Sequence, residues 1–167
     1  MTDCTNNLHS FRTNKTLQKK GVEKGCCREC RSSLVDWERI YKKDITDFDY
    51  LRDAFKLEMI RNVFWTIKQP DEKMKKYIHD KSPEQLEELV HKRLKTTLSK
   101  PKKENDWDGR QTPFDGNLIN WAQHATGTCC RQCLEEWYGI GANSEISDSD
   151  YAYLGQVILQ YISEKME

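Results

Sequence analysis

No long apolar run occurs in the sequence. None approaches the roughly 20 residues that a membrane-spanning helix needs. The first ten residues, Met1–Ser10, also lack the apolar stretch of a secretory signal peptide. These two absences predict a soluble protein of the cytoplasm that has no membrane partner.

An excess of charge of one sign is missing as well. Lys+Arg and Asp+Glu each number 27, so the chain as a whole gives no electrostatic reason to bind nucleic acid or anionic lipid. The apolar share is low, at 37%, but five Trp, seven Tyr and five Phe can fill a small core with few side chains. A length of 167 residues predicts a single domain over residues 1–167.

Helix is the element that the sequence pattern favours. Apolar residues recur every three or four positions over 47–69, which predicts an amphipathic helix that Pro70 ends. Further helices are predicted over 71–80, from the capping box Ser82–Gln85, over 130–138 and after Ser147, while 118–125 fits helix or strand and 99–116 a loop. The predicted fold class is mainly α, with about four to six helices.

Two short segments carry nearly the same cysteine pattern. They read Cys26-Cys27-Arg28-Glu29-Cys30 and Cys129-Cys130-Arg131-Gln132-Cys133, and a tryptophan follows each, Trp37 or Trp137. In a reducing cytosol, clustered cysteines more often indicate metal than disulfides. Two thiolates separated by two residues can hold one ion, and two such pairs complete the tetrahedron of structural zinc. The spacing predicts one zinc site, built from Cys27, Cys30, Cys130 and Cys133, that joins the N- and C-terminal halves.

The same cysteines are also compatible with an iron–sulfur cluster, with redox-active thiols, or with buried small apolar side chains. Cys26 and Cys129 can pack beside the ion, replace a neighbour as ligand or join a larger cluster, and Cys4 is expected to be an isolated free thiol. Arg28 and Arg131 flank the thiolates, where they can offset negative charge or face a phosphate.

A polar stretch between the knuckles, residues 106–128, is the candidate catalytic region. His124 lies five residues before Cys129, where it can act as a general acid or base, as a metal ligand, or as a structural histidine bonded to a carbonyl. Asp108, Arg110 and Gln111 can contact a substrate. From spacing alone, Asp108 and Gln111 fit an Asp-Gly turn with a capping Gln better than a substrate site.

Three functions fit these patterns. The first is a zinc-stabilised module that binds nucleic acid or another protein, because a closed four-thiolate site leaves no open coordination position. A local basic run supports it, formed by Lys92, Arg93, Lys95, Lys100, Lys102 and Lys103. The second is a zinc-scaffolded enzyme, which could act on nucleic acid, with His124 as acid or base beside Asp108, Arg110 and Gln111. The third is an iron–sulfur or thiol redox protein.

Several segments resemble, in order, a bacterial family known as domain of unknown function 4186. They are Asp108–Pro113, Gly116–Asn117, Ala122–Leu134 and Trp137–Ile140. The resemblance covers roughly Lys92 to the C-terminus, and the family typically has His where this chain has Tyr138. The first knuckle and Leu34–Arg39 resemble a longer subgroup. The resemblance implies a bacterial or phage-related cytosolic protein with a cysteine-rich site. The expected parts are an N-terminal zinc-knuckle segment (1–45), a helical segment (46–98) and a family-like core with the second knuckle (99–167).

Overall fold

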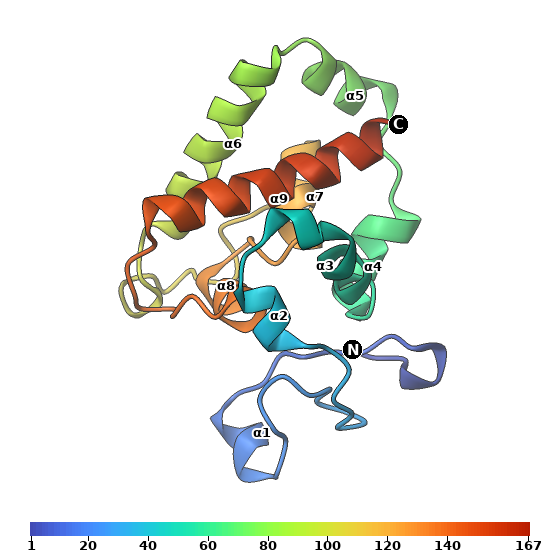
Figure 1. Ribbon diagram of the computed structural model, residues 1–167, viewed down its shortest axis with the longest axis vertical. Coiled ribbons are helices and arrows are strands. Elements are labelled where there is room, and N and C mark those ends of the chain that lie inside the picture. The colour runs from blue at the N-terminus through green and yellow to red at the C-terminus, as the bar shows by residue number, and fades with distance from the viewer.

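Helices account for the regular secondary structure of the computed structural model, which describes residues 1–167 and contains no β-strand (Figure 1). The longer helices are α3 (Phe48–Phe55), α5 (Glu72–His79), α6 (Pro83–Leu98), α7 (Leu118–Ala125), α8 (Arg131–Tyr138) and α9 (Asp148–Met166). The shorter elements are α1 (Lys15–Lys19), α2 (Trp37–Tyr41), α4 (Met59–Asn62), the turns η1 (Cys4–Asn6), η2 (Ile45–Asp47) and η4 (Lys102–Glu104), and the π-helical turn η3 (Val63–Ile67). The mainly α fold class is confirmed.

Local capping chemistry explains where the longer helices begin. The Ser82 hydroxyl accepts from the Gln85 amide at 3.1 Å, and the Gln85 side chain accepts from the Ser82 amide at 2.9 Å, which completes the predicted capping box before α6. Ser147 caps α9 through the Asp150 amide. Asn117 caps α7, so residues 118–125 form a helix and not a strand.

The single helix predicted over residues 47–69 is interrupted, which corrects that expectation. α3 ends at Phe55 and α4 begins at Met59. Between them, the His9 amide donates to the Leu57 carbonyl at 2.7 Å, and the Met59 amide donates to the His9 carbonyl at 2.8 Å. The N-terminal segment therefore occupies backbone groups that a continuous helix would use itself. Periodicity within 47–69 carries no signal of this distant partner.

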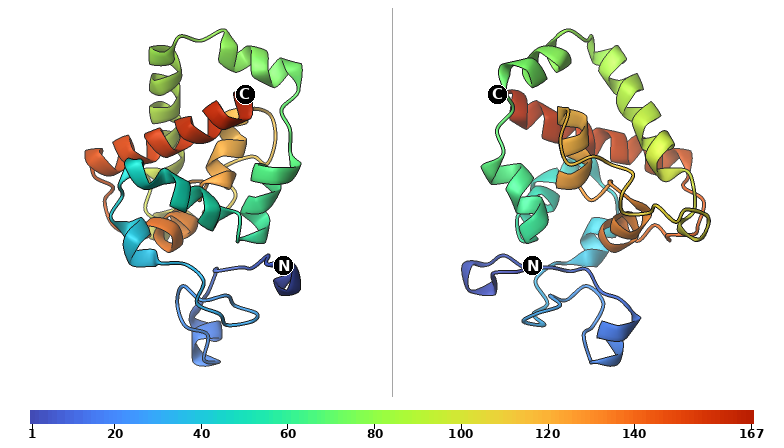
Figure 2. Two further views of the ribbon diagram at one scale, coloured as in Figure 1. Left: turned by 45° about the vertical axis from the view of Figure 1, so that its right-hand side comes forward. Right: turned by 180° about the vertical axis from the view of Figure 1, so that it is seen from behind.

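The helices pack around one core whose residues run from Phe11 to Ile162. α9 crosses the body of the molecule and packs against α6 and α7, while α2 packs against α8 (Figures 1 and 2). The segment before α2 lies at one end, below α2 and α8 (Figure 1). None of the helices is both long and apolar enough to cross a bilayer.

The tryptophans that follow the two knuckles meet in this core. The rings of Trp37 and Trp137 are 5.0 Å apart, and Phe11 packs edge-on against both. Gly127 makes room for Trp137, because a Cβ atom there would lie 2.7 Å from Trp137 Cδ1, and its φ of +69° is one that side chains disfavour. Gly25 stands in the same relation to Trp37, at 2.7 Å from its Nε1.

Candidate metal centres

The first group of metal-ligating atoms lies in the N-terminal segment. The sulfurs of Cys4, Cys27 and Cys30 and a ring nitrogen of His9 lie within 4.8 Å of one another. Cys4 Sγ is 3.8 Å from Cys27 Sγ, and Cys30 Sγ is 3.5 Å from His9 Nδ1. Tetrahedral zinc, with bonds of about 2.3 Å to sulfur and about 2.0 Å to nitrogen, places two sulfurs about 3.8 Å apart and a sulfur and a nitrogen about 3.5 Å apart. The group could hold a metal ion with four protein ligands.

Asn7 sets the orientation of the His9 ring. His9 Nε2 is 3.0 Å from Asn7 Oδ1, which only accepts hydrogen bonds, so Nε2 carries the proton and Nδ1 presents its lone pair to the sulfurs. Asn7 has a left-handed backbone with φ of +59°, and it ends the turn η1 that begins at Cys4. Metal-binding histidines usually have a hydrogen-bond partner of this kind on the second ring nitrogen.

Hydrogen bonds favour the thiolate form of Cys30. Hydrogen bonds between the Cys30 sulfur and the Ser32 hydroxyl and backbone amide lower the pKa of Cys30 to about 6. Cys27 is fully buried, and its amide donates to the Ser32 carbonyl at 3.0 Å. These bonds close a tight loop between the two cysteines, as the Cys-x-x-Cys spacing predicts.

The second group contains Cys129, Cys130 and Cys133, all of them buried, with their sulfurs within 4.8 Å of one another. Cys130 is the N-cap of α8, and its sulfur accepts from the Cys133 amide at 3.4 Å. Bonds from the other two thiols, together with nearby Arg61, hold the pKa of Cys133 well below its ordinary value. This group also could hold a metal ion, and the protein supplies three ligands.

Arg61 lies beside the second group and is almost completely buried. Its guanidinium donates to the His124 carbonyl at 2.6 Å, to Glu58 Oε2 at 3.2 Å and to Cys129 Sγ at 3.8 Å. Trp137 Nε1 also donates to Glu58, at 2.8 Å. Burial by itself would lower the pKa of Arg61, but the charges of Cys133 and Glu58 raise it well above its ordinary value. A fixed positive charge therefore faces the sulfurs.

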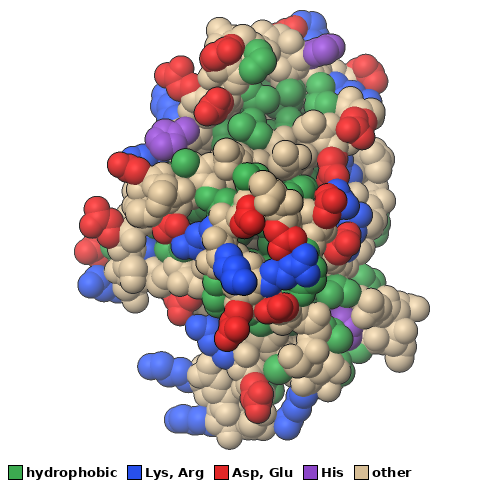
Figure 3. Space-filling model, viewed as in Figure 1, with side chains coloured by type: hydrophobic (Ala, Val, Ile, Leu, Met, Phe, Trp, Pro, Cys, Tyr) green, Lys and Arg blue, Asp and Glu red, His purple; other side chains and the backbone are tan.

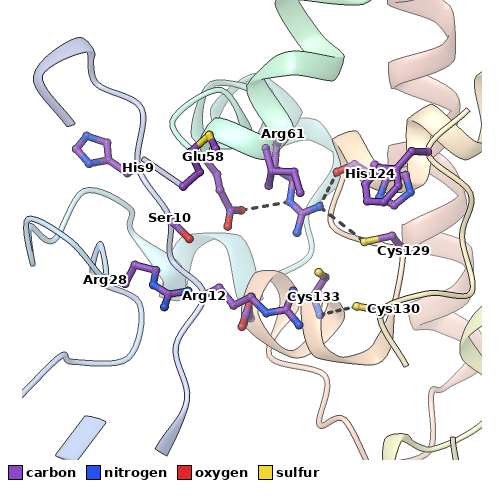
Figure 4. A pocket seen from close by; sticks show the side chains of 15 residues that line it. His9, Ser10, Arg12, Arg28, Glu58, Arg61, His124, Cys129, Cys130 and Cys133 are labelled. Atoms are coloured by element: carbon purple, nitrogen blue, oxygen red, sulfur yellow. Dashed lines mark hydrogen bonds and ion pairs between the residues drawn. The ribbon is translucent and has the colours of Figure 1, made fainter. Parts of the chain in front are cut away.

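A cavity of about 410 Å³ lies between the N-terminal segment and α8 (Figure 4). Its charged, titratable and ligating wall residues are His9, Arg12, Arg28, Glu58, Arg61, His124, Cys129, Cys130, Cys133 and Glu136. In Figure 4, Arg12 and Arg28 come from the N-terminal segment, and Arg12 extends toward Cys133. Burial raises the pKa of Glu136 to about 7. The cavity thus joins ligands of both groups to a set of positive charges.

The four cysteines of the predicted zinc site are divided between these two groups. Cys27 and Cys30 lie with Cys4 and His9, while Cys130 and Cys133 lie with Cys129, and the structure does not bring the two pairs together. The other two members of the first pair's group, Cys4 and His9, come from the N-terminal segment and not from the distant knuckle. Cys4 is a member of a group rather than an isolated thiol, and Cys26 belongs to neither group. The spacing Cys4-x4-His9 ahead of Cys-x-x-Cys was the available signal.

His124 is buried between two aromatic rings. Its ring stacks on Phe114 at 4.3 Å and on Phe64 at 5.4 Å between centroids. Its Nε2 donates to the carbonyls of Thr112 and Pro113, at 3.0 and 3.1 Å. Loss of hydration lowers the pKa of His124. His124 is absent from both ligand groups, and these contacts are those of a histidine that holds the 112–114 loop in place.

The other predicted site residues form local structure. Asp108 accepts from the Arg131 amide at 2.9 Å and from the Gln132 amide at 3.2 Å, which supports the start of α8. Gln111 donates to Asp108 at 2.9 Å. Arg110 is exposed and lies over the Trp107 ring. The Arg131 guanidinium is turned to backbone carbonyls, those of Leu98, Gly141 and Ser144. Of the two arginines that flank the knuckles, only Arg28 faces the cavity.

Part of the basic run is engaged within the chain. Arg93 donates to Asn120 at 2.7 Å, Lys102 donates to Gln132, and Lys95 lies over the Tyr151 ring. Positive and negative side chains are interspersed on the face shown in Figure 3. That face carries no extended surface of one sign.

Comparison with known proteins adds one finding. No solved structure matches the chain. The family model described as a domain of unknown function (DUF4186) matches residues 49–163, about two-thirds of the chain. The matched segment contains the second cysteine group and Arg61, and it leaves out the first group. The chain therefore belongs to the DUF4186 family and carries an additional cysteine-rich segment at its N-terminal side.

Proposed function

We propose that this protein binds a small anionic ligand in the cavity, and that a zinc ion held by Cys4, His9, Cys27 and Cys30 positions the cavity wall that receives it. The proposal is carried by one observation: Arg12 and Arg28 face the cavity, and neither guanidinium has a hydrogen-bond or ion-pair partner in the chain. Arg61, by contrast, is already paired with Glu58.

The size and lining of the cavity support a small ligand. A volume of about 410 Å³ lies within the range of roughly 300–1,000 Å³ that is usual for small-molecule sites. Guanidinium groups bind carboxylate and phosphate oxygens through paired hydrogen bonds. The expected ligand therefore carries a carboxylate or a phosphate group.

The N-terminal zinc explains how a segment with so little regular structure can hold two arginines in place. A closed four-ligand site of three cysteines and one histidine is of the structural type, and structural zinc contributes on the order of 10 kcal/mol of apparent folding free energy. Next to it, the Arg28 amide donates to the Ser10 carbonyl at 2.8 Å, and Phe11 is buried in the core. A zinc ion here would fix Arg28, which lies between Cys27 and Cys30, and Arg12, which follows His9 by three residues.

Calorimetry with inorganic phosphate and with acetate tests the proposal. The zinc-loaded chain is expected to bind at least one of the two, and Arg12→Gln or Arg28→Gln is expected to weaken binding about tenfold or more, the loss of one charge-assisted hydrogen bond. Arg110→Gln is the matched control, because Arg110 is exposed and lies outside the cavity. Equal affinities of all three variants, or no binding of either anion by the parent chain, would contradict it.

The contacts of His124, Asp108 and Gln111 favour structural roles over catalysis, so they support a binding function and not the acid–base enzyme. Binding of an oligonucleotide with the same dependence on Arg12 and Arg28, in the absence of phosphate or acetate binding, would transfer the proposal to nucleic acid.

A further inference from the structure

We infer that Cys129, Cys130 and Cys133 hold a second zinc ion whose fourth coordination position opens into the cavity, where water or the oxygen of a carboxylate or phosphate ligand completes the tetrahedron. The inference extends the proposed function, and it rests on that proposal only for the identity of the oxyanion. The binding of the metal itself can be tested without any ligand.

The arrangement of the sulfurs indicates a single ion. All three lie within 4.8 Å of one another, a range that includes the spacing of about 3.8 Å that one tetrahedral zinc requires. A [2Fe–2S] cluster places two cysteines on each iron and a [4Fe–4S] cluster places one, so in neither cluster do three cysteine sulfurs share a single ion. The geometry of the group therefore favours a mononuclear site.

The surroundings suit thiolates bound to a metal. The Cys133 amide donates to Cys130 Sγ, and Arg61 donates to Cys129 Sγ. Donors of this kind stabilise metal-bound thiolates and fix their orientation. A zinc ion with three thiolates carries a net charge of −1, and buried Arg61 lies where it offsets part of that charge.

The chain offers no fourth ligand of its own. The group contains no histidine or carboxylate, and no ring nitrogen of nearby His124 lies within 4.8 Å of all three sulfurs. All three cysteines line the cavity, so the remaining position is reached from there. Three protein ligands with an open fourth position is the coordination of catalytic zinc sites, whereas the N-terminal group, with four ligands, is closed.

The wall facing this open position supplies positive charge. Arg12 and Arg28 come from the N-terminal segment and line the same cavity as the three cysteines. An oxyanion bound to the zinc would therefore face two guanidinium groups. This places both of its recognition elements, metal and arginine, in one cavity.

Cobalt(II) substitution provides the test. The full chain loaded with cobalt is expected to bind two ions, and added phosphate or acetate should change its visible ligand-field spectrum. Only the open site can respond in this way, because the N-terminal site has four protein ligands. Arg12→Gln should shift the anion concentration needed for the spectral change upward about tenfold, and Arg110→Gln should leave it unchanged. Cys133→Ser should bind one cobalt and lose the response.

The outcomes separate this inference from the proposed function. Azide is a small metal ligand that does not require arginines, so a spectral response to azide alone supports the open position even where phosphate and acetate fail to bind. If calorimetry detects phosphate or acetate but the spectrum responds to none of the three anions, the open position is refuted while the proposed function stands. A single bound metal in the parent chain that Cys133→Ser retains, or iron with sulfide at the second group, would also overturn the inference.

Discussion

The contact between Asn7 and His9 allows a sharp test of the N-terminal zinc site. Removing the Asn7 side chain is expected to free the His9 ring without removing any ligand atom. Asn7 has φ of +59°, so alanine would add backbone strain, whereas glycine accepts this conformation. Asn7→Gly therefore isolates the loss of the 3.0 Å bond between Asn7 Oδ1 and His9 Nε2.

The expected size of the effect follows from the role of such partners. Loss of the hydrogen bond behind a metal-binding histidine typically costs 10- to 100-fold in metal affinity. That range corresponds to about 1.4–2.8 kcal/mol of binding free energy. Asn7→Asp keeps an acceptor at the same position, so it should retain most of the affinity for zinc.

Competition with a chromogenic chelator measures the affinity. The step of zinc release to the chelator that is absent from the Cys4→Ser variant is assigned to the N-terminal site. Wild-type affinity in Asn7→Gly would refute the reasoning, because His9 would then bind metal without help from Asn7 or would not bind it at all. A loss in Asn7→Asp equal to that in Asn7→Gly would refute it too.

Three further predictions concern stability in denaturant. Arg61→Met should destabilise the fold by about 3–5 kcal/mol, because Glu58 would stay buried without its cation, and Glu58→Gln in the same chain should recover part of the loss. Gly127→Ala should lower the free energy of unfolding by about 2–4 kcal/mol, because alanine disfavours the left-handed φ and its Cβ would clash with Trp137. Gly109→Ala also lies at positive φ but in open space, so it should lower it by only about 1–2 kcal/mol. Equal losses in the two variants would exclude the clash. The pKa of His124 is lowered in the folded state, so the unfolded chain takes up a proton first as pH falls below 6.5, and stability is lost on acidification. In His124→Gln the free energy of unfolding should fall less steeply with decreasing pH. An unchanged dependence of the free energy of unfolding on pH would contradict the lowered pKa.

The helices were largely predictable from the sequence because their signals are local. Ser82 and Gln85 cap α6 through side chains and amides only three residues apart, and Ser147 does the same for α9. The break between α3 and α4 was not predictable in this way, because its cause is the backbone of His9, far away in the sequence. Local periodicity reports which face of a segment is apolar, and not which other segment competes for its amides.

The candidate site also combines features that local sequence patterns predicted with features that depend on contacts between distant segments. The repeat of the cysteine pattern pointed to the two knuckles, and each lies in a group of atoms that could hold a metal ion. How those cysteines combine depends on the turn from Cys4 to His9, and residue spacing alone favoured the simpler pairing of one knuckle with the other. The positions of Arg12 and Arg61 on the cavity wall follow only from packing, since neither lies in a motif.

X-ray absorption at the zinc edge of the purified, zinc-loaded chain distinguishes two separate metal sites from one shared site. Two sites, each with three cysteines, should give an average of about three sulfur ligands and one nitrogen or oxygen ligand per zinc. Four sulfurs and no lighter ligand around a single zinc would instead show that the two knuckles share one ion, and would contradict the division of the cysteines into two groups.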